Sequence, residues 1–472
     1  MVDIYVVDVQ YGGETLDGVY SVYAQIFGRR STGESVCVKV RGLRPYFYCL
    51  APDATQCSPE TAARAIVGPL ANYLHEHGEG LKDRGGWNIR RGEQLATVTV
   101  EAESVLRTPV MRYQGECAML RISCSHPCAV PVLRDAIIGE KIGWHIGKDV
   151  RVRPGADAFE ANLDFVLRFM VDNDVRCNAW IHIADPIEDG SHMACSSQDI
   201  ICSSPRELRA YTDEEEEDKG LVPSLTVLSF DIECTAEKGL FPDPLVDTNA
   251  VIQIACDTVK VDGRKVEEVE DDATSVLFAL GATDPDVVGR DVDVRCFNDE
   301  KEMLLAFAQF VREEADPDVI TSWNGPNFDW KYIVSRCEHL GIEDQGTRFS
   351  RIPYYKTRNR EATKATKAFG TTKDNEVMMP GRTIFDLFTP VRKNYKLRSY
   401  KLGDVAEKFL GKCKDDVKPS EIAELWEGTD ADRGKLGHYW SVFLPPPLSL
   451  PSLSFPLSST FFACGALLHP RC

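Results

Sequence analysis

Apolar and polar positions alternate in short runs through the first fifty residues, as they do at residues 4–7 and 36–40. Turns that contain glycine, such as the one at Gly12 and Gly13, separate these runs. Alternation with a period of two is typical of strands with one buried and one exposed face. The chain is therefore predicted to open with a β-rich region. One later strand of this region is predicted near residues 119–123.

Two helices are predicted within this β-rich region. Ser58 followed by Pro59 is typical of a helix start, and apolar residues then recur with helical spacing as far as Leu74. Pro69 is expected to kink or split this helix, because proline lacks the N–H that an interior position needs. The second helix is predicted over residues 161–171.

In the second half of the chain, strands alternate with helices. Residues 226–230 and 251–255 predict buried strands that pair as a hairpin with a long connection. An amphipathic helix is predicted over residues 300–314, then a strand over 319–323 and a helix over 330–340. These elements predict an α/β domain.

Length and composition divide the chain further. Single hydrophobic cores stop growing at roughly 250 to 300 residues, so 472 residues predict more than one domain. We predict an N-terminal β-rich domain over residues 1–202, an acidic linker over 203–220 and the α/β domain over 221–440. The prediction allows the N-terminal domain to be discontinuous in sequence. Residues 441–472 are rich in Pro, Leu and Ser and contain no Asp, Glu or Lys. This tail is predicted to be disordered.

The charge and hydropathy patterns narrow the class of protein. No stretch approaches the roughly 18 consecutive apolar residues of a membrane helix, and the first residues lack a secretory signal, so we expect an intracellular protein without a membrane partner. A net charge of −19 is unfavourable for DNA contact. The acidic residues are concentrated in runs such as 213–218, whereas residues 356–401 are rich in Lys and Arg. A nucleic-acid partner is therefore not excluded.

Three carboxylates stand at the ends of predicted strands. Asp231 and Glu233 are two residues apart on an extended chain, so they project from the same face. Neighbouring like charges raise each other's pKa unless a cation lies between them, although an Asp-x-Glu at a strand end is also typical of a solvated turn. Asp329 follows a strand at the start of a helix, where N-capping would also explain it. Together the three fit a two-metal phosphodiester hydrolase, and their oxygen ligands favour Mg²⁺ or Mn²⁺.

The residues around these carboxylates resemble the exonuclease motifs of family B DNA polymerases. The first motif is matched by Leu228-Ser229-Phe230-Asp231-Ile232-Glu233-Cys234, and the second by Trp323-Asn324-Gly325-Pro326-Asn327-Phe328-Asp329. Further matches are Arg44-Pro45-Tyr46-Phe47-Tyr48 and Lys396-Leu397-Arg398-Ser399-Tyr400. Within the family, the delta-type replicative enzymes of eukaryotes and of large DNA viruses are the most similar. The resemblance runs from near residue 20 to Tyr439.

This resemblance implies a fold, a site and a reaction. The fold is a ribonuclease H-like 3′–5′ exonuclease domain of the α/β class, preceded by a β-rich N-terminal domain that touches the template strand in the family. Asp231, Glu233 and Asp329 would be catalytic ligands of a two-metal Mg²⁺ or Mn²⁺ site. Asn324 and Phe328 would place the 3′-terminal nucleotide. The implied activity is proofreading by hydrolysis of the 3′-terminal phosphodiester.

The resemblance also implies partners and a location. The partner is DNA, as a single-stranded 3′ end and as template. The location is the nucleus or the site of viral DNA replication. Accessory polymerase subunits are further candidate partners of a full-length parent protein.

The third exonuclease motif, which is Tyr, three residues and then Asp, is incomplete. By context Tyr439 takes the tyrosine position, a catalytic residue that helps to orient the attacking water in the family. Phe443 stands where Asp is expected, and we interpret the following tail as intron read-through or a gene-model error. Tyr400 and Asp404 have the required spacing but lie too early, so Asp404 is interpreted as a surface or capping residue. With one carboxylate missing, little or no exonuclease activity is expected.

Three interpretations stay open at this point. The favoured one is a truncated polymerase with palm, fingers and thumb absent, because no Asp-x-x-Ser-Leu-Tyr-Pro or Tyr-Gly-Asp-Thr-Asp motif occurs. The second is a free-standing 3′–5′ exonuclease that uses Asp404 or another residue as its fourth carboxylate. The third is a non-catalytic module that binds single-stranded DNA through Tyr46, Phe47 and Tyr48. Those aromatic residues are at least as typical of a core.

Overall fold

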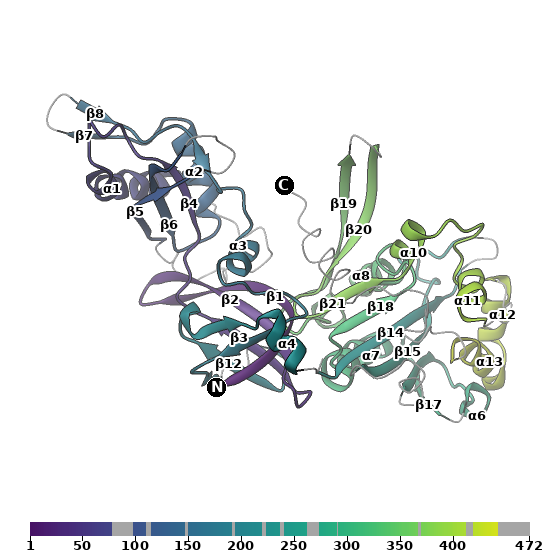
Figure 1. The fold of residues 1–472 in the computed structure, drawn as a ribbon. Helices are drawn as coiled ribbons and strands as arrows, with labels where there is room; N and C mark the ends of the chain where they lie inside the picture. The colour runs from purple at the N-terminus through teal and green to yellow at the C-terminus, as the bar shows by residue number, and fades with distance from the viewer. Residues whose placement is uncertain are drawn as a thin grey trace.

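The chain is described by a computed structural model (Figure 1). It describes residues 1–77, 98–109, 115–146, 150–190, 194–219, 223–236, 240–261, 273–289, 291–366, 370–411 and 419–441. The structure has three large apolar cores. One lies against a seven-stranded sheet, one is in a smaller α/β unit and one is in an α/β domain with a six-stranded sheet.

The seven-stranded sheet is built from both ends of the N-terminal region. Its strand order is β11-β12-β3-β2-β1-β10-β13. The strands are β1 (Val2–Leu16), β2 (Val19–Arg29), β3 (Ser35–Val40), β10 (Trp180–Ile183), β11 (Ile187–Glu188), β12 (Gln198–Cys202) and β13 (Leu208–Ala210). Asp17 and Gly18 both have positive φ, 50° and 78°, which suits the two-residue turn between β1 and β2. The predicted β-rich opening is therefore confirmed.

The middle of the N-terminal region forms a separate unit, which stands at the upper left in Figure 1. Its sheet has the order β5-β6-β4-β9. The strands are β4 (Tyr46–Leu50), β5 (Val100–Arg107), β6 (Cys117–Cys124) and β9 (Ala158–Phe159), and the helices are α1 (Pro59–His77) and α2 (Ala129–Ile138). A small hairpin of β7 (Trp144–Ile146) and β8 (Val150–Val152) joins it, and α3 (Phe165–Asp172) leads back to the larger sheet. The N-terminal region thus holds two apolar cores.

Helix α1 differs from its prediction, because it is a single helix from Pro59 to His77 that includes Pro69. Its apolar stripe, which includes Ile66, Leu70 and Leu74, is buried in the core of the smaller unit. Packing of this stripe on both sides of Pro69 outweighs the loss of one backbone hydrogen bond. The predicted split is therefore wrong, and the kink, the other predicted alternative, stays a prediction.

The acidic segment at 203–220, expected to be a linker, contains regular structure. It forms a short 3₁₀ helix, η1 (Pro205–Glu207), then β13 and then α4 (Asp213–Lys219). Strand β13 pairs with β10, and Arg209 Nη1 lies 2.7 Å from a Glu215 carboxylate oxygen. Arg176 likewise binds Asp213 at 3.0 Å. Pairing of β13 with β10, the reciprocal hydrogen bonds of Thr212 and Glu215 at the start of α4 and the nearby arginines therefore give regular structure to a segment that its composition alone predicts to be a linker.

The α/β domain has a six-stranded sheet in the order β17-β16-β15-β14-β18-β21. The strands are β14 (Leu225–Cys234), β15 (Val251–Val261), β16 (Thr274–Leu280), β17 (Val292–Phe297), β18 (Val319–Ser322) and β21 (Thr383–Asp386). Strands β14, β15 and β16 form an antiparallel meander, and β18 and β21 then continue the sheet parallel to β14. This order is that of the ribonuclease H-like fold expected from the sequence.

Helices cover both faces of this sheet. The main core packs α7 (Glu300–Gln309), its π-helical extension η2 (Phe310–Ala315) and α8 (Asp329–His339) against residues such as Phe230 and Phe278. On the other face, α6 (Pro285–Val288) and α13 (Asp430–Ser441) lie over β15 and β16. The remaining elements are α9 (Glu343–Gly346), α10 (Phe388–Asn394), α11 (Leu402–Leu410), α12 (Pro419–Glu427) and the hairpin of β19 (Arg358–Thr366) and β20 (Gly370–Met378), which projects from the domain in Figure 1.

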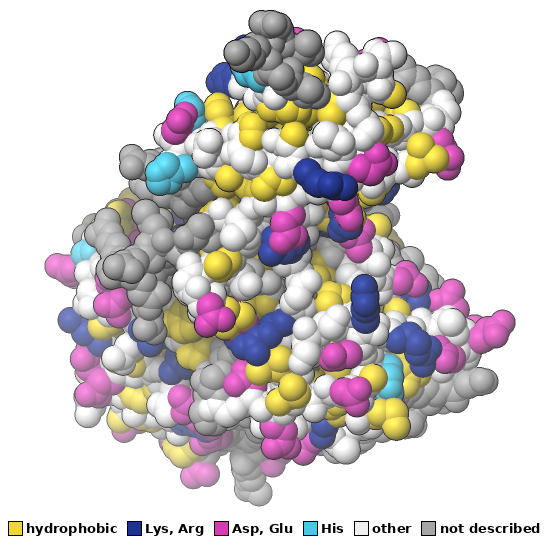
Figure 2. Space-filling view, turned by 90° about the vertical axis from the view of Figure 1, so that its left-hand side faces the viewer, with side chains coloured by type: hydrophobic (Ala, Val, Ile, Leu, Met, Phe, Trp, Pro, Cys, Tyr) yellow, Lys and Arg dark blue, Asp and Glu magenta, His cyan; other side chains and the backbone are white. Residues whose placement is uncertain are grey.

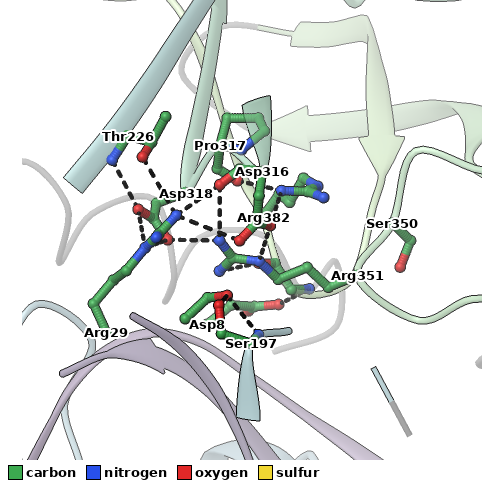
Figure 3. Close-up of polar contacts among 12 residues, drawn as sticks. Asp8, Arg29, Ser197, Thr226, Asp316, Pro317, Asp318, Ser350, Arg351 and Arg382 are labelled. Atoms are coloured by element: carbon green, nitrogen blue, oxygen red, sulfur yellow. Dashed lines mark hydrogen bonds and ion pairs between the residues drawn. The ribbon is translucent and has the colours of Figure 1, made fainter. Parts of the chain in front are cut away.

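A buried charged cluster joins the seven-stranded sheet to the α/β domain (Figure 3). Arg29, the last residue of β2, donates through Nε to both carboxylate oxygens of Asp318, at 2.9 and 2.7 Å. Arg351 donates to the same carboxylate at 2.8 Å. Asp8 of β1 accepts the backbone N–H of Gly381 at 2.7 Å. Beside this cluster, an apolar group from both bodies is buried, formed by Phe27, Cys37, Ala194, Ile352 and Tyr355.

Two features concern the surface. On the face that Figure 2 shows, Lys and Arg side chains lie among Asp and Glu side chains, so the net charge of −19 is not spread as one acidic surface there. Within the described ranges, no helix is both long and apolar enough to cross a membrane.

One buried carboxylate of the sheet leads to a stability prediction. Burial raises the pKa of Asp257, on β15, to about 6, and Ser275 Oγ donates to it at 2.6 Å. The folded state then binds a proton more tightly than the unfolded state, so stability falls as the pH rises from about 4 to about 6. Asp257→Asn should raise the free energy of unfolding at pH 7.5 by up to about 3 kcal/mol, since each pKa unit corresponds to about 1.4 kcal/mol.

Urea unfolding at pH 4 and pH 7.5 measures this effect. Ser275→Ala is the matched control, because it removes the donor and keeps the carboxylate, and it should lower stability at pH 7.5. Equal stability of the wild-type chain and Asp257→Asn at pH 7.5 would contradict the assignment.

Candidate functional site

Strand β14 places Asp231 and Glu233 on the sheet face opposite the main core. The alternate residues Phe230 and Ile232 are buried in that core, so the two acidic residues point the other way. Both carboxylate residues are partly exposed and lie within the strand, which extends to Cys234. The sequence placed them just after the strand, so the strand is longer than predicted.

Asp329 begins α8 and is almost fully buried, with 2% of its surface exposed. The N-cap position is Phe328, and no side chain forms a cap hydrogen bond there, so capping does not explain this aspartate. Burial, then the neighbouring charge of Asp231 and a hydrogen bond with it, raise the pKa of Asp329 well above its usual range. Its second carboxylate oxygen, Oδ1, is buried without a hydrogen-bond partner among the described residues.

The parallel pairing of β14 with β18 brings these two carboxyl groups together. Val227, Leu228 and Ser229 face Val319, Ile320 and Thr321 in register, so both strands end at the same edge of the sheet. Two neighbouring carboxylates, one of them buried, need a proton or a cation between them. The pair Asp231–Asp329, with one oxygen unsatisfied, therefore suits a hard divalent cation.

Glu233 lies further along β14, opposite Gln253 of β15. At about 3.4 Å per residue, this is roughly 7 Å from Asp231. Within the described ranges, no group of three or more His, Cys, Asp or Glu side chains is arranged to hold a metal ion by itself. The chain thus brings Asp231 and Asp329 into contact, with Glu233 beside them on the same face.

The loop from β18 to α8 carries the predicted nucleotide-binding residues. Asn324 has a left-handed backbone with φ of 61°, and its side-chain oxygen accepts from Asn327 Nδ2 at 2.8 Å. A Cβ atom on Gly325 would lie 2.0 Å from Ser322 Oγ, so only glycine fits this position. Asn324 therefore shapes the loop as well as lying next to the candidate site.

Phe328 has an aromatic neighbour to which the sequence assigned no role. The ring of Phe241, which is 77% exposed, lies 5.4 Å from the Phe328 ring in an edge-on arrangement. The loop behind Phe241 is held by Arg336, whose guanidinium donates to the carbonyl groups of Pro244, Val246 and Asp247. In the sequence, Gly239-Leu240-Phe241-Pro242 follows the first motif and also resembles the family, but this resemblance did not predict the contact with Phe328.

Helix α13, which carries Tyr439, is joined to β15 at Gln253. Gln253 Nε2 donates to the Arg433 carbonyl at 3.0 Å, which fixes α13 beside the strand position opposite Glu233. The side chain of Tyr439, Phe443 and the tail lie outside the described side chains and residues. Asp404 is exposed in the first turn of α11.

Tyr46, Phe47 and Tyr48, which the third interpretation assigns to binding single-stranded DNA, make contacts within the protein. Phe47 is fully buried in the core of the smaller N-terminal unit, and Tyr48 is also buried. The ring of Tyr46 has two guanidinium groups over it, those of Arg121 at 3.9 Å and Arg168 at 4.5 Å. These rings therefore serve packing and cation–π contacts within the fold.

Comparison with known proteins first defines the fold class. The chain is similar to the solved structure of the family B DNA polymerase from the hyperthermophilic archaeon Pyrobaculum calidifontis, with a TM-score of 0.60 and 22% identity. This match covers 95% of the chain and 45% of that structure. The chain therefore shares the fold of the matched part of that polymerase.

Sequence comparison then gives the family. Residues 156–405, more than half of the chain, match the model of the DNA polymerase family B exonuclease domain, and the chain belongs to this family. It is 31% identical over 427 residues to the DNA polymerase delta catalytic subunit of Oryza sativa subsp. japonica and 32% identical over 433 residues to that of Bos taurus. These matches cover 88% and 89% of this chain. The chain spans about a third of the length of both relatives, 35% in each case.

Proposed function

We propose that this chain is the proofreading region of a replicative DNA polymerase and that its α/β domain removes the 3′-terminal nucleotide from single-stranded DNA. One observation carries the proposal: the buried Asp329 carboxyl group meets Asp231 at the edge of the sheet and leaves one oxygen unsatisfied. Such a pair is costly in a folded protein unless a cation or proton compensates it. Membership of the exonuclease-domain family supports a cation.

Each site residue then has a role in hydrolysis. Asp231, Asp329 and Glu233 are the residues that would hold Mg²⁺ or Mn²⁺. Such ions, when bound, would supply an activated water and stabilise the leaving 3′ oxygen. Tyr439, from α13, orients the attacking water.

Three residues place the substrate in this proposal. Asn324 and Phe328 position the 3′-terminal nucleotide, and the exposed ring of Phe241 beside Phe328 offers a second aromatic surface. Stacking of a base on an aromatic side chain contributes about 1 to 3 kcal/mol and tolerates every base. A proofreading site must accept any mismatched nucleotide, so aromatic contacts suit it.

The incomplete third motif lowers the expected rate. Phe443 occupies the position where the family has the last carboxylate. A metal site that lacks one carboxylate misplaces the water, and an error of about 1 Å costs roughly 10²-fold in rate. We therefore expect residual cleavage only. A free-standing exonuclease that uses Asp404 is the competing proposal, but Asp404 is exposed in the first turn of α11, which does not favour it.

The similarity to delta-type polymerases also supports proposals for the domains, location and partners of this chain. Residues 1–202 form the N-terminal domain and contact the template strand, and residues 221–440 form the exonuclease domain. The chain acts in the nucleus, or at a site of viral DNA replication, as part of a longer polymerase. Its activity requires Mg²⁺ or Mn²⁺, and accessory subunits bind the longer polymerase.

Degradation of a 5′-labelled single-stranded oligonucleotide tests the proposal. The purified chain with Mn²⁺ should shorten the oligonucleotide slowly from its 3′ end, and the double variant Asp231→Ala, Glu233→Ala should not. Asp404→Ala should leave the residual rate unchanged. A folded wild-type chain with neither Mn²⁺ binding nor shortening would contradict the proposal, and loss of the residual rate in Asp404→Ala would favour the competing one.

A further inference from the structure

The loop that connects β18 to α8 is held by a carboxylate from the neighbouring strand β21. Asp386, the last residue of β21, accepts the backbone N–H of Asn324 through Oδ1 at 2.7 Å. The same oxygen accepts the backbone N–H of Phe388 at 3.2 Å, and Oδ2 accepts the Thr389 hydroxyl at 2.9 Å. One side chain thus connects the loop of the second exonuclease motif to the first turn of α10.

The contact falls at the residue that sets the direction of the loop. Asn324 adopts a φ of 61°, which residues other than Gly, Asn and Asp rarely adopt. Its carbonyl group accepts the N–H groups of Asn327 at 3.0 Å and Phe328 at 3.1 Å. The conformation of Asn324 therefore determines where Phe328 and then Asp329 lie.

The geometry at Asp386 indicates more than a helix cap. The hydrogen bond to Asn324, at 2.7 Å, is shorter than those from the Phe388 N–H and the Thr389 hydroxyl of α10. Strand pairing places Asp386 beside Ser322 of β18, and the Leu387 N–H donates to the Ser322 carbonyl at 3.1 Å. Carboxylates that lose most of their contact with water need such hydrogen bonds. The shortest of these three hydrogen bonds is the one to Asn324, in the loop between β18 and α8.

We propose that Asp386 is a positioning residue of the exonuclease site: its Oδ1 atom holds Asn324 in the left-handed conformation and so keeps Asp329 against Asp231. The inference rests on the proposed function of that site and assigns a role to a residue outside the exonuclease motifs. Asp386 acts on the site through Asn324, whose N–H it accepts.

Hydrogen exchange and Mn²⁺ titration of the full-length chain test this role together. In Asp386→Ala, amide exchange in residues 323–329 should rise about 10-fold, because one hydrogen bond is lost. Mn²⁺ affinity should fall about 10-fold or more, as it does when a residue that supports metal ligands is removed. Asp386→Asn should stay within about 3-fold of wild type in both, since the amide oxygen still accepts from Asn324.

Two further variants separate positioning from helix capping and from misfolding. Thr389→Val removes only the contact to Oδ2 and should leave both readouts for the loop at wild-type values. Asn324→Val keeps Asp386 but disfavours the left-handed conformation, so it should reproduce both changes if Asp386→Ala does not fold.

The outcomes distinguish this inference from the proposed function. Unchanged loop exchange in a folded Asp386→Ala, equal losses in Asp386→Ala and Asp386→Asn, or the same losses in Thr389→Val would each overturn the positioning role. Absence of Mn²⁺ binding by the wild-type chain would overturn the proposed metal site. The exchange rates of residues 323–329 would then still decide whether Asp386 holds Asn324.

Discussion

Arg29→Ala should lower the free energy of unfolding by about 3 to 5 kcal/mol, because it breaks a buried ion pair and leaves the partner charge without full compensation. Arg29 donates to both oxygens of Asp318, whose side chain is fully buried, and to the Asp316 carbonyl at 2.6 Å. Asp318 also accepts the Thr226 N–H at 2.9 Å, near the start of β14. The loss should therefore destabilise the α/β domain as well as the seven-stranded sheet.

Urea unfolding of the full chain measures this loss, and Arg30→Ala is the matched control. Arg30 is the next residue, its side chain is 28% exposed, and its ion pair with Glu34 is long, at 3.8 Å. Exposed pairs of this kind contribute less than about 1 kcal/mol. Similar losses in Arg29→Ala and Arg30→Ala would contradict a special role for the buried cluster.

Asp329→Asn should raise stability in EDTA at pH 8 by about 1 to 3 kcal/mol, which is the usual cost of a buried polar group without compensation. The neutral amide removes the charge repulsion with Asp231 that raises the pKa of Asp329. The folded wild-type chain binds a proton here more tightly than the unfolded chain, so its stability falls as the pH rises. The variant should show a flatter dependence on pH.

The same variant should lose the stabilisation that Mn²⁺ gives. Thermal melts with EDTA and with excess Mn²⁺ should separate widely for the wild-type chain and coincide for Asp329→Asn. Asp286→Asn, an exposed carboxylate on α6, is the control and should behave like wild type in both conditions. A Mn²⁺-dependent rise in the melting temperature of Asp329→Asn would contradict the assignment of this residue as a metal ligand.

Local patterns predicted the elements around the site well. The strands near residues 226–230 and 251–255 and the two helices that follow were expected from periodicity, and the structure has β14, β15, α7 and α8 there. Their apolar positions repeat with the period of one element, which is visible in a short window of sequence. Strands β16, β17 and β21 were not predicted.

Segments whose order depends on distant partners were predicted less well. The acidic run near 213–218 had the composition of a solvated linker, but Arg176 and Arg209 lie near it in space and neutralise part of its charge. The helix around Pro69 likewise continues because its apolar side packs on a sheet. Composition and helix propensity reflect only interactions between residues that are close in the sequence, and not the stabilising contacts with distant residues.

The sequence alone determined that Asp231 and Glu233 share one face, because two residues complete one period of a strand. It also indicated Asp329, Asn324 and Phe328 through their order in the motifs. Only the tertiary structure decided that Asp329 contacts Asp231, because this contact requires parallel pairing of β14 with β18. The contacts of Arg29 with Asp318, and of Asp386 with Asn324, likewise join residues far apart in the chain. Such contacts depend on which strands pair and how the domains pack against each other, and the periodicity of a short stretch of sequence does not show either.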